Sequence, residues 1–318
     1  MKTTFVHGLE NLAPLPAGST VVTIGTFDGI HRGHQAIFAR VREVALSTQL
    51  APVLVTFHPH PRTVVTPDNI PMLLTTIEEK QKFVPCFFEG TVLVVKFDES
   101  LRNLSAEQFV KQVLIDRIGV KHLIVGYDHG LGKDRSGNTA TLEQLGTEFG
   151  FDLEVVKPVI CNDAPISSTR IRQALAYARY DFAVDLLGHD YAICGNVERG
   201  IGLGKKLGYP TANVKYSRWK LLPPEGVYAC WVQLGKEERG GMMFVGQNHF
   251  NPVARLTVEV NLFDFERDIY DEEIIVYPTR YVRQNRRFAS TELLVAQIKQ
   301  DKEQVLEILE KQGERTCH

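Results

Sequence analysis

Two histidines behind a glycine-rich turn are the residues of this sequence best suited to chemistry on a phosphate. His31 and His34 follow an apolar run at 21–24 that has the composition of a β-strand. The turn contains three glycines, Gly25, Gly29 and Gly33. Histidines three residues apart share one face of a helix, and a helix N-terminus offers N–H groups and a positive dipole end to a phosphate. The segment predicts chemistry on a nucleoside triphosphate; the alternative is a tight turn with two surface histidines.

A second glycine-rich segment, residues 195–213, has the composition of a phosphate-binding loop but not its spacing. A P-loop ending at Lys205 would need glycine at 199 and serine or threonine at 206, where Arg199 and Lys206 stand. The dinucleotide fingerprint also fails, because Lys205 takes the place of its third glycine. The segment contains the glycines Gly200, Gly202 and Gly204. It predicts a basic flap whose backbone approaches phosphates; the alternative is a flexible surface loop.

Two neutral oxygen ligands follow this flap. Pro210 stiffens the exit of the flap and presents Thr211 and Asn213. A hydroxyl and an amide oxygen suit a magnesium ion that substrate phosphates also bind. We therefore expect Thr211 and Asn213 to hold the Mg²⁺ that accompanies ATP.

A carboxylate in the strand-like run 256–263 is a candidate general base. Strand alternation places Thr257, Glu259 and Asn261 on one face and the apolar residues between them on the other. A carboxylate there can accept the proton of an attacking hydroxyl. The alternative for Glu259 is an ordinary solvated face.

Composition describes an ordinary globular protein. The chain has 318 residues, of which 44% are hydrophobic and 23% charged, and this length favours two domains. A net charge of -2 gives no electrostatic basis for binding nucleic acid or an anionic membrane. Five scattered cysteines, and a start without a signal-peptide core or a membrane-length apolar run, predict a cytoplasmic protein.

The order of apolar runs differs between the two halves. In the first half, strand-like runs (21–24, 53–57, 91–97, 122–126 and 153–156) alternate with helical patterns (33–46, 76–83, 105–117 and 141–149). This alternation predicts a doubly wound, Rossmann-like parallel sheet with ligands beyond the carboxyl ends of its strands. Two helical segments, 168–179 and 182–187, close this half.

The second half has short strands with glycine and proline between them. These runs (191–197, 226–234, 243–245, 256–263 and 273–281) predict an antiparallel β-barrel. A final helix is expected from Ser290, a suitable N-cap, to about Lys311, with an apolar stripe. The stripe consists of Leu294, Ile298, Val305 and Leu309. The predicted domains are 1–186 and 187–318.

Taken together, these segments resemble the bifunctional bacterial riboflavin kinase/FAD synthetase family over nearly the whole chain. In the first half the resemblance rests on residues 25–34, 57–61 and 166–172. It implies that the first domain transfers AMP from ATP to FMN with release of pyrophosphate, with His31, His34 and Arg170 stabilising charge on the phosphoryl oxygens. The implied nucleotide-binding residues of the first half are Gly25, Thr26, Phe27, Asp28, Gly29, Gly33, Ser167, Ser168 and Thr169. Those of the second half are the flap residues Gly200, Gly202, Gly204 and Lys205.

In the second half the resemblance rests on the run Gly208-Tyr-Pro-Thr-Ala-Asn213 and on Glu259. It implies a riboflavin kinase in which Glu259 is the base and Thr211 and Asn213 bind Mg²⁺ with ATP. The implied flavin-binding residues are Gly208, Arg283 and Phe288 in this half, and Asp128 and His129 in the first half. Riboflavin, FMN and ATP are the expected partners, and no oligomeric state is predicted.

The chain departs from the family pattern in the flavin loops. His129 and Leu131 stand where the family has two phenylalanines, and Asn285 stands where it has an acidic residue. Two alternatives therefore stand beside the bifunctional enzyme: a riboflavin kinase whose first domain is weakened in FMN binding, and a flavin or nucleotide sensor without turnover. Retention of both histidines, Arg170 and Glu259 argues against the sensor.

Overall fold

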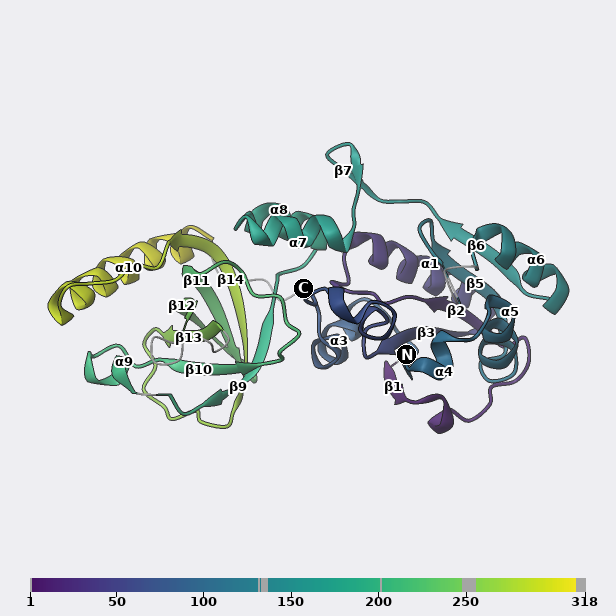
Figure 1. The fold of residues 1–318 in the computed structure, drawn as a ribbon, viewed down its shortest axis with the longest axis horizontal. Helices are drawn as coiled ribbons and strands as arrows, with labels where there is room; N and C mark the ends of the chain where they lie inside the picture. Colours follow the sequence, from purple (N-terminus) through teal and green to yellow (C-terminus); the bar gives the residue numbers. More distant parts are fainter. Residues whose placement is uncertain (1, 131, 133–136, 201, 248–255, 313–318) are drawn as a thin grey trace. The chain divides into compact units, whose positions relative to one another are not determined.

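The computed structural model describes residues 2–130, 132, 137–200, 202–247 and 256–312 (Figure 1). By its internal contacts the chain divides into two compact units, 1–167 and 168–318. The two helices that follow residue 167 belong to the second unit by contact. The predicted functional boundary at 186/187 stays a prediction.

Among the described residues of the first unit, six strands form one parallel sheet. The strands are β1 (Thr4–His7), β2 (Thr20–Ile24), β3 (Ala51–His58), β4 (Thr91–Lys96), β5 (Val120–Gly126) and β6 (Asp152–Val156). Their order is β1-β4-β3-β2-β5-β6. The chain runs from β2 through β3 to β4 on one side and then returns to β5 and β6 on the other, so the order reverses between β2 and β5. This is the predicted doubly wound sheet.

Helices and short segments connect these strands. They are α1 (Arg32–Thr48), α2 (Arg62–Val65), α3 (Ile77–Phe83), α4 (Glu99–Arg102), α5 (Ala106–Phe109), α6 (Thr139–Phe149), the π-helical segment η4 (Val110–Ile115) and the 3-10 turns η1 (Leu9–Asn11), η2 (Pro67–Asn69) and η3 (Val84–Cys86). A two-stranded hairpin, β7 (Ile160–Cys161) and β8 (Ala164–Pro165), extends away from the sheet in Figure 1.

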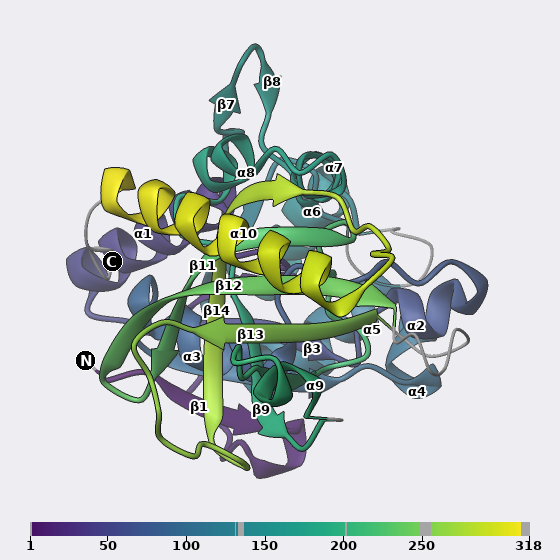
Figure 2. The same ribbon diagram turned by 90° about the vertical axis from the view of Figure 1, so that its left-hand side faces the viewer.

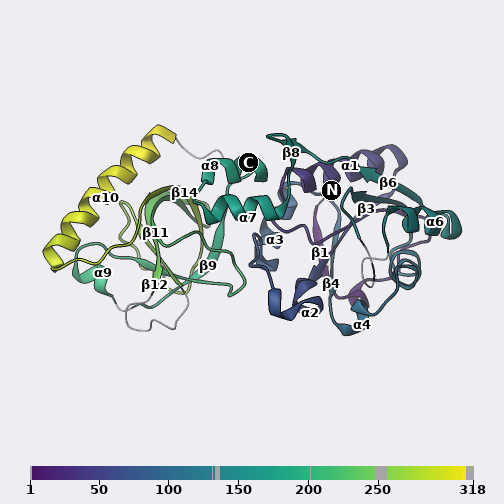
Figure 3. The same cartoon turned by 45° about the horizontal axis from the view of Figure 1, so that its top comes forward.

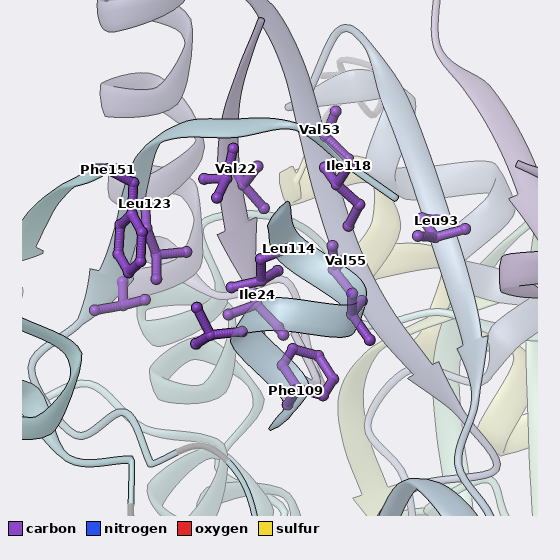
Figure 4. Close-up of a cluster of buried hydrophobic side chains, with 14 of the residues drawn as sticks. Val22, Ile24, Val53, Val55, Leu93, Phe109, Leu114, Ile118, Leu123 and Phe151 are labelled. Atoms are coloured by element: carbon purple, nitrogen blue, oxygen red, sulfur yellow. The ribbon is translucent and has the colours of Figure 1, made fainter. Parts of the chain in front are cut away.

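Each face of the sheet carries a cluster of buried side chains. Figure 4 shows one cluster, in which Val22 and Ile24 of β2 pack near Phe109 and Leu114. The alternate residue of β2, Val21, belongs to the opposite cluster with side chains of α1, the helix above the sheet in Figure 3. Successive strand residues point to opposite faces, so an uninterrupted apolar run supplies both clusters. The central strands are buried as the sequence predicts.

Three parts of the first unit differ from the sequence-based expectation. The edge strand β1 was missed because its run is short and ends in a histidine. The strand β6 is less buried than expected, since it also lies at an edge and Val155 is 36% exposed. The helix expected at 105–117 is divided into α5 and η4, with Ser105 as its N-cap in a capping box with Gln108.

The second unit begins with α7 (Ser168–Ala176) and α8 (Tyr180–Leu187) and continues into a barrel. Its strands are β9 (Ile193–Glu198), β10 (Ala212–Tyr216), β11 (Gly226–Leu234), β12 (Glu237–Gln247), β13 (Leu256–Leu262) and β14 (Glu273–Arg283). These described strands close in the order β10-β13-β12-β11-β14-β9, and every pair is antiparallel. The predicted barrel is confirmed. Strand β10 and the short helix α9 (Leu203–Lys206) were not expected from the sequence, and β12 is longer than the predicted run 243–245.

The last described helix, α10 (Thr291–Gln312), lies across the barrel in Figure 2 and contacts β11, β12 and β14. The predicted N-cap is confirmed, because Ser290 Oγ accepts a hydrogen bond from the Leu293 N–H at 3.4 Å. Within the expected stripe, Val305 and Leu309 are fully buried against Phe263, whereas Leu294 and Ile298 are half-buried.

The described cysteines, Cys86, Cys161, Cys194 and Cys230, are all free thiols. Among the described residues, no helix combines the length and the apolar character that crossing a membrane requires.

Candidate active sites

The glycine-rich turn lies where the strand order of the first unit reverses. The turn follows β2, and a second loop follows its neighbour β5 at Gly126. In an open α/β sheet the crevice beyond the carboxyl ends of two such strands is the usual ligand site. A Cβ at Gly126 would lie 3.3 Å from Ile37 Cδ1 of α1, so the second loop starts against the histidine-bearing helix.

The two histidines are stacked at the start of α1. His31 is the N-cap residue, and its ring centroid lies 3.6 Å from that of His34 with an interplanar angle of 18°. The Phe27 ring meets His34 edge-on at 5.3 Å. The predicted pairing of these histidines at a helix N-terminus therefore holds, and both residues belong to the end of α1 that has unsatisfied backbone N–H groups.

The backbone of the turn is unusual at several positions. Phe27, Gly29 and Ile30 have φ values of 47°, 91° and 45°. Left-handed conformations at non-glycine residues are uncommon and persist where the surroundings fix them. A Cβ at Gly33 would lie 3.1 Å from the His31 ring, so glycine here leaves room for the stacked pair.

Burial holds the pKa of His34 well below its usual value, and the neighbouring charges of His31 and Lys80 lower that pKa further. Part of the His34 residue is exposed, but its Nδ1 atom is buried without a hydrogen-bond partner among the described residues. At neutral pH His34 is therefore a neutral imidazole, which donates a single N–H. This narrows the sequence-based prediction: His34 can donate a hydrogen bond to a phosphoryl oxygen, but it carries no positive charge.

The segment 75–80 supports the turn, and the sequence analysis did not single it out. Thr75 N donates to Asp28 Oδ1 at 2.9 Å, and Gly29 N donates to Thr75 Oγ1 at 3.1 Å. Lys80 Nζ donates to the Thr26 carbonyl oxygen at 2.5 Å. The available signal was the Thr76–Glu79 capping box, which marks the start of α3 but does not reveal what α3 contacts.

The candidate flavin loop follows β5. The His129 N–H donates to the Gly126 carbonyl at 3.1 Å and closes a turn in which Asp128 is exposed and His129 half-buried. Leu131, the second departure from the family pattern, lies outside the described residues. Asp128 and His129 thus follow β5, the neighbour of the strand β2 that leads into the histidine turn.

The candidate phosphate block begins the second unit. Ser167 ends the first unit, and Ser168, Thr169 and Arg170 form the first turn of α7. The Arg170 guanidinium lies 5.7 Å from the centroid of the Phe182 ring on α8. A contact of this block with the ATP phosphates stays a prediction.

In the barrel, strand register brings together residues that are far apart in the sequence. Asn213 of β10 is the register partner of Glu259 on β13. The Thr211 hydroxyl lies 3.3 Å from Glu259 Oε2 and donates to it. Asn261, on the same face as Glu259, donates to the Pro210 carbonyl at 2.7 Å. The predicted face of β13 is therefore turned toward the Pro210–Asn213 segment.

The flap that precedes this segment closes over it. A Cβ at Gly200 would lie 2.1 Å from Asn213 Nδ2, and one at Gly204 would lie 2.3 Å from the Tyr209 carbonyl oxygen. Glycine is therefore required where the flap backbone meets the site. Gly202 and Gly208 have positive φ values of 73° and 82°. Lys205 is exposed, and its contact with a phosphate group stays a prediction.

The donor set of the barrel site fits a magnesium ion carried by ATP. Thr211 and Asn213 supply neutral oxygens beside the Glu259 carboxylate, which is the hard-ligand chemistry that Mg²⁺ prefers. Among the described residues, no cluster of three or more His, Cys, Asp or Glu side chains is arranged to hold a metal ion. A metal held here would therefore share its coordination with substrate phosphates.

Arg283, a predicted flavin contact, forms a buried ion pair. Its Nε and Nη2 atoms donate to Asp301 of α10, with Nη2 2.6 Å from Oδ2. Asp301 is 1% exposed and also accepts a hydrogen bond from Gln297 at 2.9 Å. Phe288 lies over the same guanidinium at 5.9 Å. Arg283 thus fixes the loop between β14 and α10, and Phe288 is carried by that loop.

Two family models match the chain in succession. The model described as FAD synthetase matches residues 15–170, and the model described as riboflavin kinase matches residues 187–309. A curated relative from Pseudomonas fluorescens, named bifunctional riboflavin kinase/FMN adenylyltransferase, is 39% identical and aligns over 93% of this chain and 94% of its own. Relatives of the same name from Escherichia coli K12 and Bacillus subtilis are 36% and 32% identical, over 93% and 96% of this chain and 95% and 98% of theirs.

The chain belongs to the bifunctional riboflavin kinase/FMN adenylyltransferase family. The FAD synthetase match contains the histidine turn, Asp128 and the block up to Arg170. The riboflavin kinase match contains the flap, Glu259 and the Arg283–Asp301 pair. Most of α7 and all of α8 except its last residue, Leu187, lie between the two matches.

A solved structure from Streptococcus pneumoniae shares the whole architecture of this family member. It is 29% identical, has a TM-score of 0.82 and covers 95% of this chain and 98% of its own. That protein is named a macrolide-efflux protein. The assignment to the bifunctional family rests on the two domain matches and the curated relatives.

Proposed function

We propose that the barrel phosphorylates riboflavin with Glu259 as the general base. The observation that carries this proposal is the 3.3 Å contact between Thr211 Oγ1 and Glu259 Oε2, which puts a carboxylate beside the candidate Mg²⁺ ligands. Glu259 accepts the proton of the ribityl 5′-hydroxyl as this oxygen attacks the γ-phosphorus of ATP, and ADP leaves as the bond from the γ-phosphorus to the bridging oxygen breaks. The flap covers the phosphates, and Lys205 meets their negative charge. When bound, Mg²⁺ neutralises charge on the phosphates.

The first domain, by the same proposal, transfers AMP from ATP to FMN at the histidine turn. The observation that carries this assignment is the stacked His31–His34 pair at the N-terminus of α1, beside the strand-order reversal. The FMN phosphate is already ionised near neutral pH, so the step needs charge stabilisation more than a base. His31, His34 and the α1 N–H groups supply these hydrogen bonds. Residues 1–186 and 187–318 are the proposed functional domains.

The flavin contacts follow from the same geometry. Asp128 and His129 follow the strand next to the histidine turn, where the FMN acceptor must approach. In the barrel, Phe288 contacts the flavin and Gly208 leaves space for it. Arg283 holds the loop that carries Phe288 in place through its ion pair with Asp301. His129 is a flat ring that can stack on a flavin in place of phenylalanine.

Product analysis tests the proposal against the two alternatives. The protein is incubated with riboflavin, ATP and Mg²⁺, and flavins are separated over time. The bifunctional enzyme gives FMN and then FAD. FMN without FAD would favour the kinase whose first domain is weakened, and the absence of both products would favour a sensor.

A further inference from the structure

A buried lysine, Lys80, contacts the histidine turn. Lys80 lies on α3, a seven-residue helix, and is 6% exposed. Its ammonium donates to the Thr26 carbonyl oxygen at 2.5 Å. A lysine is seldom buried unless its charge is compensated. Its position therefore requires a reason beyond packing.

The carbonyl that Lys80 contacts does not itself require a cation. Thr56 Oγ1 also donates to the Thr26 carbonyl, at 3.3 Å, so a neutral donor already satisfies this group. Burial lowers the pKa of Lys80, and the nearby Asp28 carboxylate opposes this shift. Burying the Lys80 ammonium costs desolvation free energy, although the Thr56 hydroxyl alone can satisfy the Thr26 carbonyl. The charge is therefore the informative property of this side chain.

Local structure aims this charge at the turn. The Thr76–Glu79 capping box fixes the first turn of α3, and Glu79 is itself 1% exposed. Thr75 holds the turn from the same segment through Asp28 and Gly29. The segment 75–80 thus contacts Thr26, Asp28 and Gly29, which lie on either side of Phe27, a residue with a left-handed φ value. Such conformations persist when the surroundings over-determine them.

The positive charge also reaches the residues around the site. Burial is the main cause of the lowered pKa of His34 and of His58, a residue of the second block of the family resemblance, and the Lys80 charge lowers both pKa values further. Because His34 is neutral, it supplies no positive charge to the place where the triphosphate would lie. The buried ammonium supplies one at a fixed position, in a medium where charges are screened weakly.

We propose that Lys80 is a positioning residue of adenylyl transfer, which holds the 25–33 turn through Thr26 and gives the floor of the ATP site its positive charge. The proposal rests on the assignment of adenylyl transfer to this turn. Losing one hydrogen bond to a charged group changes a rate by about 10- to 100-fold. We expect kcat to fall and the KM for ATP to rise, so that kcat/KM drops by about that factor. The KM for FMN should be unchanged within about twofold, because the turn faces ATP.

The test compares Lys80→Met with Lys82→Met in the full chain. Lys82 is two residues further along α3 and about 200° around the helix, so it is a matched control on another face. FAD formation from supplied FMN is measured with varied ATP. Hydrogen exchange of β2 and β3 amides reports folding of the first unit, and riboflavin phosphorylation reports folding of the barrel in the same sample. Lys80→Met should lose adenylylation and keep kinase activity; Lys82→Met should keep both.

A titration of the His34 ring by NMR adds a readout that simple destabilisation would not move. His31 and Lys80 are the titratable groups that act on His34, so removing the Lys80 charge should raise the pKa of His34. The pKa should be unchanged in Lys82→Met. Adenylylation within about twofold of wild type in a folded Lys80→Met protein, or an unmoved His34 pKa, would overturn the proposal.

Two further results keep the proposal separable from its foundation. If Lys80→Met loses both activities, ¹⁵N signals of lysine ammonium groups are followed in the wild type as a non-hydrolysable ATP analogue is added. A Lys80 signal that moves supports the proposal, and one that does not move contradicts it. If His31→Ala leaves FAD synthesis intact, the assignment of the turn fails; if His31→Ala abolishes it and Lys80→Met spares it, the role of Lys80 alone fails.

Discussion

The two candidate sites are assembled in opposite ways. The site in the first unit is a continuous turn, Gly25–His34, that the segment 75–80 and the neighbouring strand β3 hold in place. The barrel site joins Thr211 to Glu259, 48 residues away, through the pairing of β10 with β13. A contiguous turn depends on local backbone conformation, whereas a register-built site depends on the whole barrel. Mutations should therefore separate the two activities, and the barrel site should respond to distant packing changes.

The largest separation is expected from Glu259→Gln. Removing a general base costs about 10²- to 10⁴-fold in rate, so FMN formation from riboflavin should fall by that amount. FAD formation from supplied FMN should stay within about twofold, because the turn in the first unit does not use this carboxylate. Initial rates of both reactions on one sample provide the check. Parallel loss of both activities in a folded protein would show that the sites are not independent.

The converse variant is His31→Ala. Loss of one donor to a developing negative charge costs about 10²- to 10³-fold, and this loss should fall on the conversion of FMN to FAD. Riboflavin phosphorylation should be unaffected. His122→Ala is a matched control in the same unit, since His122 lies on β5 with its ring 3.3 Å from Asp152. Full adenylylation by His31→Ala would remove the role of the stacked pair.

A packing change remote from Glu259 should weaken the barrel site. Asp301→Asn leaves Arg283 buried without its counter-charge, which costs about 3–5 kcal/mol in unfolding free energy. Both tryptophans, Trp219 and Trp231, belong to the second unit, so tryptophan fluorescence in urea reports the barrel. We expect a lower midpoint and a raised KM for riboflavin, with adenylylation unchanged.

The exposed Glu307→Gln on the same helix is the control for this variant and should alter neither quantity. An Asp301→Asn protein with the wild-type midpoint would mean that the ion pair does not fix the flavin loop.

The smallest effect concerns pH and the first unit. The folded-state pKa of His34 is below 6.5, so below that pH the unfolded chain binds more protons than the native one. The stability of the first unit should therefore be intact above about pH 6.5 and decline as the pH falls. Hydrogen exchange of β2 and β3 amides measures this decline, which His34→Gln should reduce. Equal slopes in the two proteins would contradict a neutral His34 whose pKa is lowered in the folded state.

Sequence alone predicted the parts of these sites that are local. The glycine spacing and the His31–His34 pair can be recognised because each residue acts within one turn. Glu259 could be placed on the correct face of its strand by alternation, but its contact with Thr211 required the register of β10, a strand that was missed. Lys80 and Asp301 were missed because their importance comes from burial and from partners distant in sequence. A charged residue in a helical pattern is normally solvated.

The most direct test of independent sites is complementation between two inactive proteins. Glu259→Gln and His31→Ala are mixed with riboflavin, ATP and Mg²⁺, and FAD is measured over time. Each variant alone should form little FAD, because the first makes no FMN and the second does not adenylylate it. The mixture should convert riboflavin to FAD, since FMN released by one protein is the substrate of the other. A mixture that makes no more FAD than its components would contradict the division of labour between the two sites.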